Sequence, residues 1–297
     1  MNAGRLVKKI KGLEIQGAKN VALAGLRALS LYASGIKSEN KRDFLGVLKS
    51  KSELVSSARP TEPALRNSIS FVMANLRRCK DVSDIRNTLQ REVGEFSRNI
   101  ESTIYKIGEI GARRIPDGAV VFTHCHSNTV MEIFRRAKSV GKKFGVVCTE
   151  TRPMNQGLVT AKQLAKMRIP VTLIVDSAAR TFMKKCDLVI IGADAITSTG
   201  DVVNKVGSSI IALIAEEQKK PFYVAAGTHK IDPETAKGFL EPIEERPAKE
   251  ITNRRLEGVK IRNPAFDVVS ARRITGIITE SGIMPPQNVY RLLQKLI

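Results

Sequence analysis

Residues 170–194 read PVTLIVDSAARTFMKKCDLVIIGAD and contain two short apolar runs separated by a polar segment long enough for a short helix. Both runs are rich in β-branched residues, which favour strands. Strands that are apolar on both faces are typical of a parallel sheet covered by helices on each side. The stretch therefore predicts a strand, a crossover helix and a second strand.

The same pattern of apolar runs and helical stretches continues on both sides of this unit. Four further apolar runs alternate with helical stretches: AVVFTH (119–124), KFGVVCTE (143–150), PFYVAAG (221–227) and ITGIITE (274–280). Strands that alternate with crossover helices predict a Rossmann-like, doubly wound, mainly parallel sheet over residues 116–297. The charged, proline-containing segment from about 233 to 263 is expected to be an excursion between the fifth and sixth strands.

The first 115 residues have a different pattern, with helical spacing throughout. Val21, Leu23 and Leu26 recur at helical intervals, and residues 41–58, 61–79 and 82–113 continue the pattern. Thr61 is a candidate cap for the helix within residues 61–79. Pro116 and Gly118 end the last helix. We therefore expect an all-helical N-terminal domain, residues 1–115, before the α/β domain, residues 116–297.

Composition limits the class of protein. The 297-residue chain has no run of the ~20 apolar residues that a membrane span requires and no secretory leader at its start, which predicts a soluble, cytoplasmic protein. Its 49 basic and 29 acidic side chains give a net charge of +20, which favours anionic partners. Because aromatic residues make up only 5% and no nucleic-acid-binding motif is present, a phosphorylated metabolite is favoured over a dedicated nucleic-acid site.

Polar residues collect where the predicted strands end. THCHSN, TETRP, DSA, GAD and GTHK each follow one of the apolar runs. Ligands of doubly wound sheets bind outside the carboxyl ends of the strands, so these segments predict the site. The first strand is not followed by G-x-G-x-x-G, and there is no Walker A loop, so neither a dinucleotide nor ATP hydrolysis is supported, and we expect no cofactor.

Cys125 stands between His124 and His126 at the first of these strand ends. The four cysteines form no CxxC pair, which predicts reduced thiols. Beside a helix start near Ser127, the Cys125 thiolate is stabilised by free N–H groups, and protonated histidines would add to this effect. The alternatives are an inert buried thiol and a metal site, and metal is disfavoured because Cys125 points away from the two histidines.

Two carboxylates follow apolar strands, Asp194 in IIGAD and Asp176 in LIVD. Partial desolvation raises the pKa of a carboxyl group and can keep it protonated as a general acid. An aspartate that caps a turn is the alternative for each. The local sequence does not show which of the two aspartates is the better candidate for a general acid.

Positive side chains accompany these strand ends. Asn204 and Lys205 are expected to open a helix, where an amide and an ammonium suit a phosphate or a sugar hydroxyl. Lys230 and Arg152 are expected to add charge, with a solvated surface role as the alternative for each.

Taken together, THCHS, TETRP, VDSAA, IGADAI, GDVVNKVGSS, KPFYVAAGTHK and IITESGIMPP, with EIQGAKNVA and SARPTEPALRNSI in the helical part, resemble a known family. This family joins sugar-phosphate aldose–ketose isomerases to the regulatory subunits of the eukaryotic guanine-nucleotide exchange factor for translation initiation. The resemblance covers nearly the whole chain. It is strongest to the archaeal members that isomerise ribose 1,5-bisphosphate, which have the HCHS and GAD…NK pair.

The resemblance implies an enzyme that converts α-D-ribose 1,5-bisphosphate to D-ribulose 1,5-bisphosphate without metal or cofactor. It implies that Cys125 is the base and Asp194 the acid. It also implies a hexamer built from dimers and a role in nucleoside monophosphate (AMP) salvage. The implied substrate contacts come from Gly17, Ala18, Lys19, Arg59, His126, Ser127, Asn204, Lys205 and Lys230.

Two other functions remain open within this family. A non-catalytic regulatory protein would bind a partner of the translation-initiation apparatus and turn over no sugar phosphate. A methylthioribose-1-phosphate isomerase would share the Cys125 and Asp194 pair but need an apolar pocket in place of a second phosphate site.

Overall fold

A computed structural model describes residues 2–15, 17–60, 62–239 and 243–296. The chain divides into two compact units, Met1–Ser102 and Thr103–Ile297, which meet inside one long helix, α5 (Val82–Ala112). The predicted boundary between residues 115 and 116 falls in the loop after this helix and stays a prediction about domains that fold separately. Within the described residues, no helix has the length and apolar character needed to cross a membrane.

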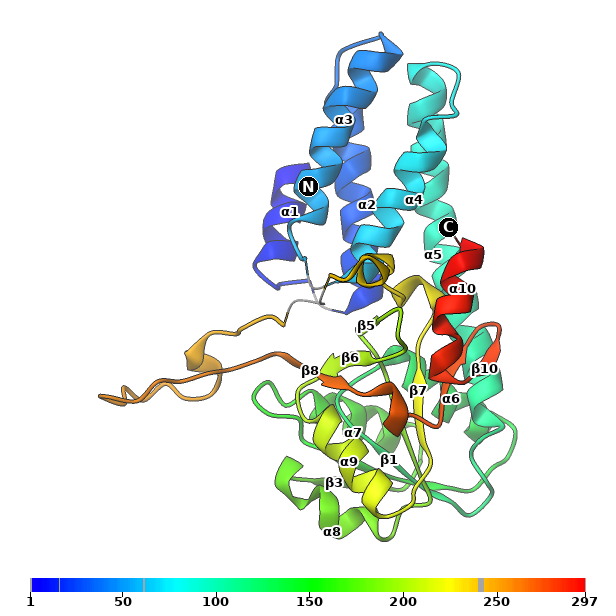
Figure 1. The fold of residues 1–297 in the computed structure, drawn as a ribbon, viewed down its shortest axis with the longest axis vertical. Coiled ribbons are helices and arrows are strands. Elements are labelled where there is room, and N and C mark those ends of the chain that lie inside the picture. Colours follow the sequence, from blue (N-terminus) through cyan, green and yellow to red (C-terminus); the bar gives the residue numbers. More distant parts are fainter. Residues whose placement is uncertain (1, 16, 61, 240–242, 297) are drawn as a thin grey trace. The chain divides into compact units, whose positions relative to one another are not determined.

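The first unit is all-helical, as predicted (Figure 1). Its helices pack around a core that includes Leu26, Phe44 and Leu65. The predicted cap Thr61 lies outside the described residues, and the helix that follows it has Pro63 at its first position, where proline's fixed φ suits a helix start. The helices are α1 (Ala3–Lys11), α2 (Ala18–Gly35), α3 (Lys41–Ser56), α4 (Pro63–Leu76) and the first part of α5.

The second unit is built on a seven-stranded sheet in the order β10-β9-β7-β4-β1-β2-β3, parallel except for the edge strand β10. The six predicted strands are all present, and their spatial order is that of a Rossmann-like sheet. The strands are β1 (Val120–Thr123), β2 (Gly145–Thr149), β3 (Val171–Ile174), β4 (Leu188–Ile191), β7 (Phe222–Ala225), β9 (Gly276–Thr279) and β10 (Gly282–Met284).

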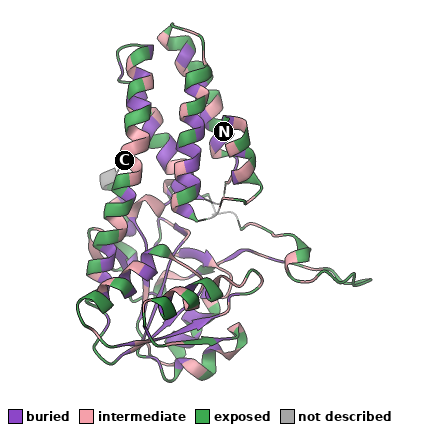
Figure 2. Cartoon of the chain, turned by 180° about the vertical axis from the view of Figure 1, so that it is seen from behind, coloured by how far each residue is buried: buried purple, intermediate pink, exposed green. Residues whose placement is uncertain are grey.

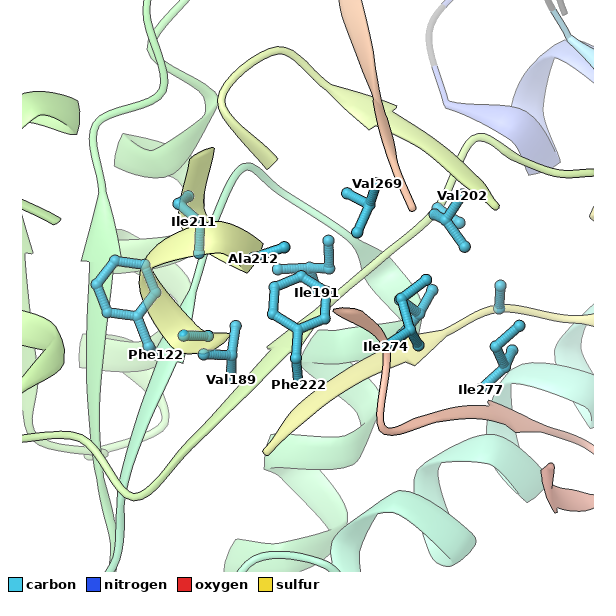
Figure 3. Packing of buried hydrophobic residues seen from close by; sticks show 14 of the residues in the cluster. Phe122, Val189, Ile191, Val202, Ile211, Ala212, Phe222, Val269, Ile274 and Ile277 are labelled. Carbon is cyan, nitrogen blue, oxygen red and sulfur yellow. The ribbon is translucent and has the colours of Figure 1, made fainter. Parts of the chain in front are cut away.

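Helices cover both faces of this sheet, which explains why the central strands are apolar throughout. On one face, Phe122, Val189 and Phe222 pack with Ile211 and Ala212 of α9 (Figure 3). Each such aromatic or aliphatic side chain contributes about 1.5–3 kcal/mol when fully buried. The buried strands are the purple arrows of Figure 2. The helices are α6 (Asn128–Ser139) and α7 (Gln156–Lys166) with the end of α5 on one face, and α8 (Ala179–Met183), α9 (Ser208–Glu217) and α10 (Val289–Leu296) on the other.

A second, antiparallel sheet of three strands was not predicted. It consists of β5 (Ala195–Ile196), β6 (Val202–Lys205) and β8 (Phe266–Val269). The expectation that Asn204 and Lys205 open a helix is wrong, because both lie on β6 and α9 begins only at Ser208. The predicted excursion after the fifth strand is confirmed. Residues 243–265 form an arm (orange in Figure 1) in which Glu245 bridges to Pro264.

Candidate active site

The site forms where β1 and β4 lie side by side in the sheet. This is the point at which the strand order reverses, and ligands of doubly wound folds bind there. Cys125 follows β1 and Asp194 follows β4. The two loops touch, because a Cβ atom built on Gly192 would lie 2.7 Å from the Ser127 Oγ. Glycine at position 192 therefore lets the GAD loop approach the HCHSN loop.

The Cys125 backbone is held on both sides. Its φ is +66°, in the left-handed region that few residues other than glycine adopt. Its N–H donates to the Thr151 Oγ1 at 2.9 Å, and its carbonyl oxygen accepts from the Thr160 Oγ1 at 2.8 Å. Two residues later Ser127 caps α6 by accepting from the Val130 N–H, which confirms the predicted helix start.

Burial raises the pKa of the Cys125 thiol from its ordinary value of 9.0 to about 11. The ammonium of Lys205 and the N–H of His126 act in the opposite direction, while the carboxylates of Asp194 and Asp176 raise the pKa further. The free thiol is therefore protonated at neutral pH. Lys205 is the group that eases its ionisation most.

The flanking histidines would assist ionisation of Cys125 only if they were protonated, and the structure does not favour that state. His124 is buried, and its Nε2 donates to the Val206 carbonyl at 2.9 Å, so its Nδ1 accepts from the Thr149 Oγ1 at 2.6 Å. Burial lowers the pKa of both His124 and His126, which keeps both rings neutral. Since both nitrogens of His124 are engaged, neither is open to a metal ion.

The structure separates the two aspartates that the sequence left unranked. The Asp176 carboxylate accepts from the N–H groups of Thr151, at 2.8 Å, and Arg152, at 2.7 Å. Among the described residues, none forms a hydrogen bond or ion pair with the partly exposed Asp194 carboxylate. Lys230 donates to the carbonyl of Ala193 and so brings its ammonium beside Asp194. Asp176 is thus held in the scaffold, and Asp194 is available to a ligand.

Lys205 and Asn204 reach the site from β6. Asn204 is buried and donates to the Ser208 Oγ at 2.8 Å, and the Lys205 Nζ lies 4.7 Å from the centre of the Phe266 ring. The Asp267 carboxylate occupies the start of α9, where it accepts from Gly207 and Ser209 N–H groups. Asp267 therefore satisfies these N–H groups, and the positive charge near Cys125 comes from the Lys205 ammonium.

The remaining predicted contacts belong to the helical unit, Met1–Ser102. Gly17, with φ +83°, precedes α2, and Ala18 is its first residue. Lys19 forms an ion pair with Glu101 at 2.9 Å, and Arg59 is partly buried. The other seven lie in the Thr103–Ile297 unit: Cys125, His126, Ser127, Asp194, Asn204, Lys205 and Lys230.

Sequence reasoning missed three groups that shape this site. Thr151 and Thr160 fix Cys125, and Asp267 caps α9 beside Lys205. Of these only Thr151 carried a signal, since it lies in TETRP at a strand end.

A thiol and a carboxylate on the two sides of the switch point, with lysines beside them, define a Rossmann-like protein suited to acid–base chemistry on an anionic ligand. The chain belongs to the Initiation factor 2 subunit family, whose model matches residues 14–286.

Known relatives within this family carry different names. The chain is 43% identical to a ribose 1,5-bisphosphate isomerase of Methanocaldococcus jannaschii over 97% of this chain and 93% of that one. It is 37% identical to a methylthioribose-1-phosphate isomerase of Geotalea uraniireducens over 94% and 86%. A solved structure of a Pyrococcus horikoshii protein titled translation initiation factor eIF-2B superposes with a TM-score of 0.82, with 33% identity over 96% of this chain and 97% of that one.

Proposed function

We propose that the protein is an aldose–ketose isomerase that converts α-D-ribose 1,5-bisphosphate to D-ribulose 1,5-bisphosphate. The observation that carries this proposal is the placement of Cys125 and Asp194 on opposite sides of the switch point, with Lys205 and Lys230 beside them. The near full-length similarity to proteins named ribose 1,5-bisphosphate isomerase supports it.

The reaction divides between the two catalytic groups. The C1 phosphate leaves the sugar without a free aldehyde, so the ring opens while the phosphate remains. The Cys125 thiolate removes the proton on C2, the electron pair forms a C1=C2 double bond, and the C1–O4 bond breaks as O4 takes a proton from Asp194. The enol then passes its O2 proton to the Asp194 carboxylate while C1 takes the proton back from Cys125. The product is the ketose, and both groups return to their starting state.

The surrounding groups suit an anionic substrate. Two phosphate groups carry up to about four negative charges at neutral pH, and ammonium groups bind them through charge-assisted hydrogen bonds. We propose Lys205 and Lys230 of the sheet unit for this task, with Ser127 and Asn204 as hydroxyl and amide partners. The family resemblance also implies contacts from His126 and, in the helical unit, from Gly17, Ala18, Lys19 and Arg59, and these stay predictions.

Two relatives' names suggest other functions for the same fold. The methylthioribose-1-phosphate isomerase acts, by its name, on a substrate with one phosphate, and the P. horikoshii protein is titled as a translation initiation factor. An available carboxylate opposite a thiol favours catalysis over a purely regulatory role. The family resemblance also implies a hexamer built from dimers, a role in AMP salvage and a place in the cytoplasm, and these stay predictions.

The proposal is tested by incubating the purified chain with α-D-ribose 1,5-bisphosphate and, separately, with methylthioribose 1-phosphate. We expect D-ribulose 1,5-bisphosphate from the first and little turnover of the second. Cys125→Ser and Asp194→Asn should each lower kcat by about 10²–10⁴-fold, the usual contribution of a general base or acid. Full turnover by the Cys125→Ser variant would rule out the mechanism.

A further inference from the structure

The left-handed backbone at Cys125 is an unusual feature for a residue with a side chain. Such a conformation costs of order 1–3 kcal/mol and persists where its surroundings over-determine it. At Cys125 the N–H group is bound by Thr151 and the carbonyl oxygen by Thr160. The loop is therefore held in a conformation that the local sequence alone does not favour.

Thr151 is itself held in the same way. Its φ is +64°, which is an outlier for a β-branched residue, and its side chain is fully buried. The Asp176 carboxylate accepts from the Thr151 N–H at 2.8 Å and from the next N–H, that of Arg152, at 2.7 Å. These two hydrogen bonds fix the backbone at Thr151. A β-branched side chain on a fixed backbone has few alternative positions for its hydroxyl.

The hydroxyl of Thr151 has a second neighbour that limits its movement. The Thr149 Oγ1 lies 3.2 Å away and is itself bound to the Nδ1 of the neutral His124. The ends of three adjacent strands thus contribute to one chain of contacts. Asp176 follows β3, Thr149 ends β2 and Thr151 follows it, and His124 and Cys125 follow β1. None of these hydrogen bonds involves the Cys125 sulfur, so their effect on it acts through the backbone.

We propose that Thr151, fixed by Asp176, is a positioning residue that holds the Cys125 backbone so that its thiol points at the C2 proton of the substrate. The proposal deepens the proposed function and rests on it for the identity of the proton. A displacement of about 1 Å between reacting groups can cost about a hundredfold in rate. Loss of the Thr151 hydroxyl should therefore lower kcat by about that factor and leave KM near the wild-type value, because Thr151 is buried behind the loop.

The test compares Thr151→Val, which keeps the branched shape and removes the hydroxyl, with Thr151→Ser, which keeps the hydroxyl. We expect the valine variant to lose turnover and the serine variant to regain most of it. Thr88→Val is the matched control, because Thr88 is a buried threonine of the helical unit. Asp176→Asn should lower kcat in the same direction even though it removes a carboxylate that raises the pKa of Cys125.

A second readout does not depend on isomerase activity. The rate at which iodoacetamide alkylates Cys125 at one alkaline pH, followed by mass spectrometry, reports how accessible the thiol is. In Thr151→Val we expect faster alkylation of Cys125, while the buried Cys148 and Cys186 stay protected as a check that the fold is intact. A displaced thiol predicts slower turnover together with faster alkylation.

Three results would overturn the positioning role. These are wild-type turnover and alkylation in Thr151→Val, equal impairment of Thr151→Ser and Thr151→Val, and loss of protection at Cys148 and Cys186 in every variant at this position. If the wild-type protein has no isomerase activity, the proposed function fails separately. The alkylation of Cys125 in the two Thr151 variants then decides the positioning role alone.

Discussion

At the scale of single residues, the Cys125 thiol has to ionise before it can accept a proton. Burial raises its pKa to about 11, so the thiolate fraction rises about tenfold for each pH unit between neutrality and that value. We expect kcat/KM to increase with pH over this range, because this parameter reports the free enzyme. A kcat/KM that stays level from neutral to strongly alkaline pH would contradict a thiolate base.

Lys205 provides the matched test of this electrostatic argument. Its ammonium lowers the pKa of Cys125, so Lys205→Met should move the rise in kcat/KM to higher pH. Lys230→Met also removes one ammonium from the site, but Lys230 is bonded to the Ala193 carbonyl. We expect that variant to raise KM and leave the pH profile in place. Equal shifts in both variants would mean that the effect is one of net charge.

Individual residues also show how far the sequence could define the site. Cys125 and Asp194 were placed at one sheet edge by the rule for doubly wound folds, and the family resemblance favoured Asp194 over Asp176. The role of Asp176 could not be predicted, because it depends on a left-handed backbone at Thr151 that its own β-branched side chain disfavours. The charge of the histidines was left open in the sequence, because it depends on burial, which the local sequence does not reveal.

At the scale of elements, the central strands were predictable and the small sheet was not. LVII and VVFT are apolar throughout because helices cover both faces, and that pattern is visible in any window. β6 is only four residues long, Val202–Lys205, and pairs with β8 across about sixty residues of chain. Its neighbour SSIIALIAEE has a strong helical pattern, so the strand was assigned to the helix that follows it.

The pairing of β6 with β8 predicts a dual role for Asp267. Asp267 lies opposite Asn204 and accepts from the Gly207 and Ser209 N–H groups at the start of α9. Asp267→Ala should lower the free energy of unfolding by about 0.5–2 kcal/mol, as for other lost caps, and raise KM by loosening Asn204 and Lys205. Asp267→Asn keeps one acceptor oxygen, so its loss of stability and its rise in KM should both be smaller.

Urea denaturation and steady-state kinetics measure the two effects. Asn40→Ala removes the side chain that caps α3 in the helical unit and is the comparison variant. It should lower stability by a similar amount and leave KM unchanged. An Asp267→Ala protein with wild-type KM would confine Asp267 to a capping role.

At the scale of the whole molecule, three thiols of the sheet unit have raised pKa values, although Cys125 is partly exposed and Cys148 and Cys186 are buried. Burial raises the pKa values of Cys125, Cys148 and Cys186 to about 11, against the ordinary value of 9.0 that applies once the chain unfolds. Folding therefore favours the protonated thiols. Their contribution to stability is complete below pH 9 and is lost as the pH rises toward 11, because the unfolded chain ionises first.

We therefore expect the free energy of unfolding to fall between pH 9 and 11, by about 1.36 kcal/mol for each thiol and each pH unit at most. Urea denaturation at a series of pH values measures this slope. Cys186→Ala removes one of the three thiols and replaces it with a small apolar side chain, so its slope should be smaller by about one third. A slope identical to that of the wild-type protein would contradict this prediction. It would show that the pKa of Cys186 is the same in the folded and unfolded chains.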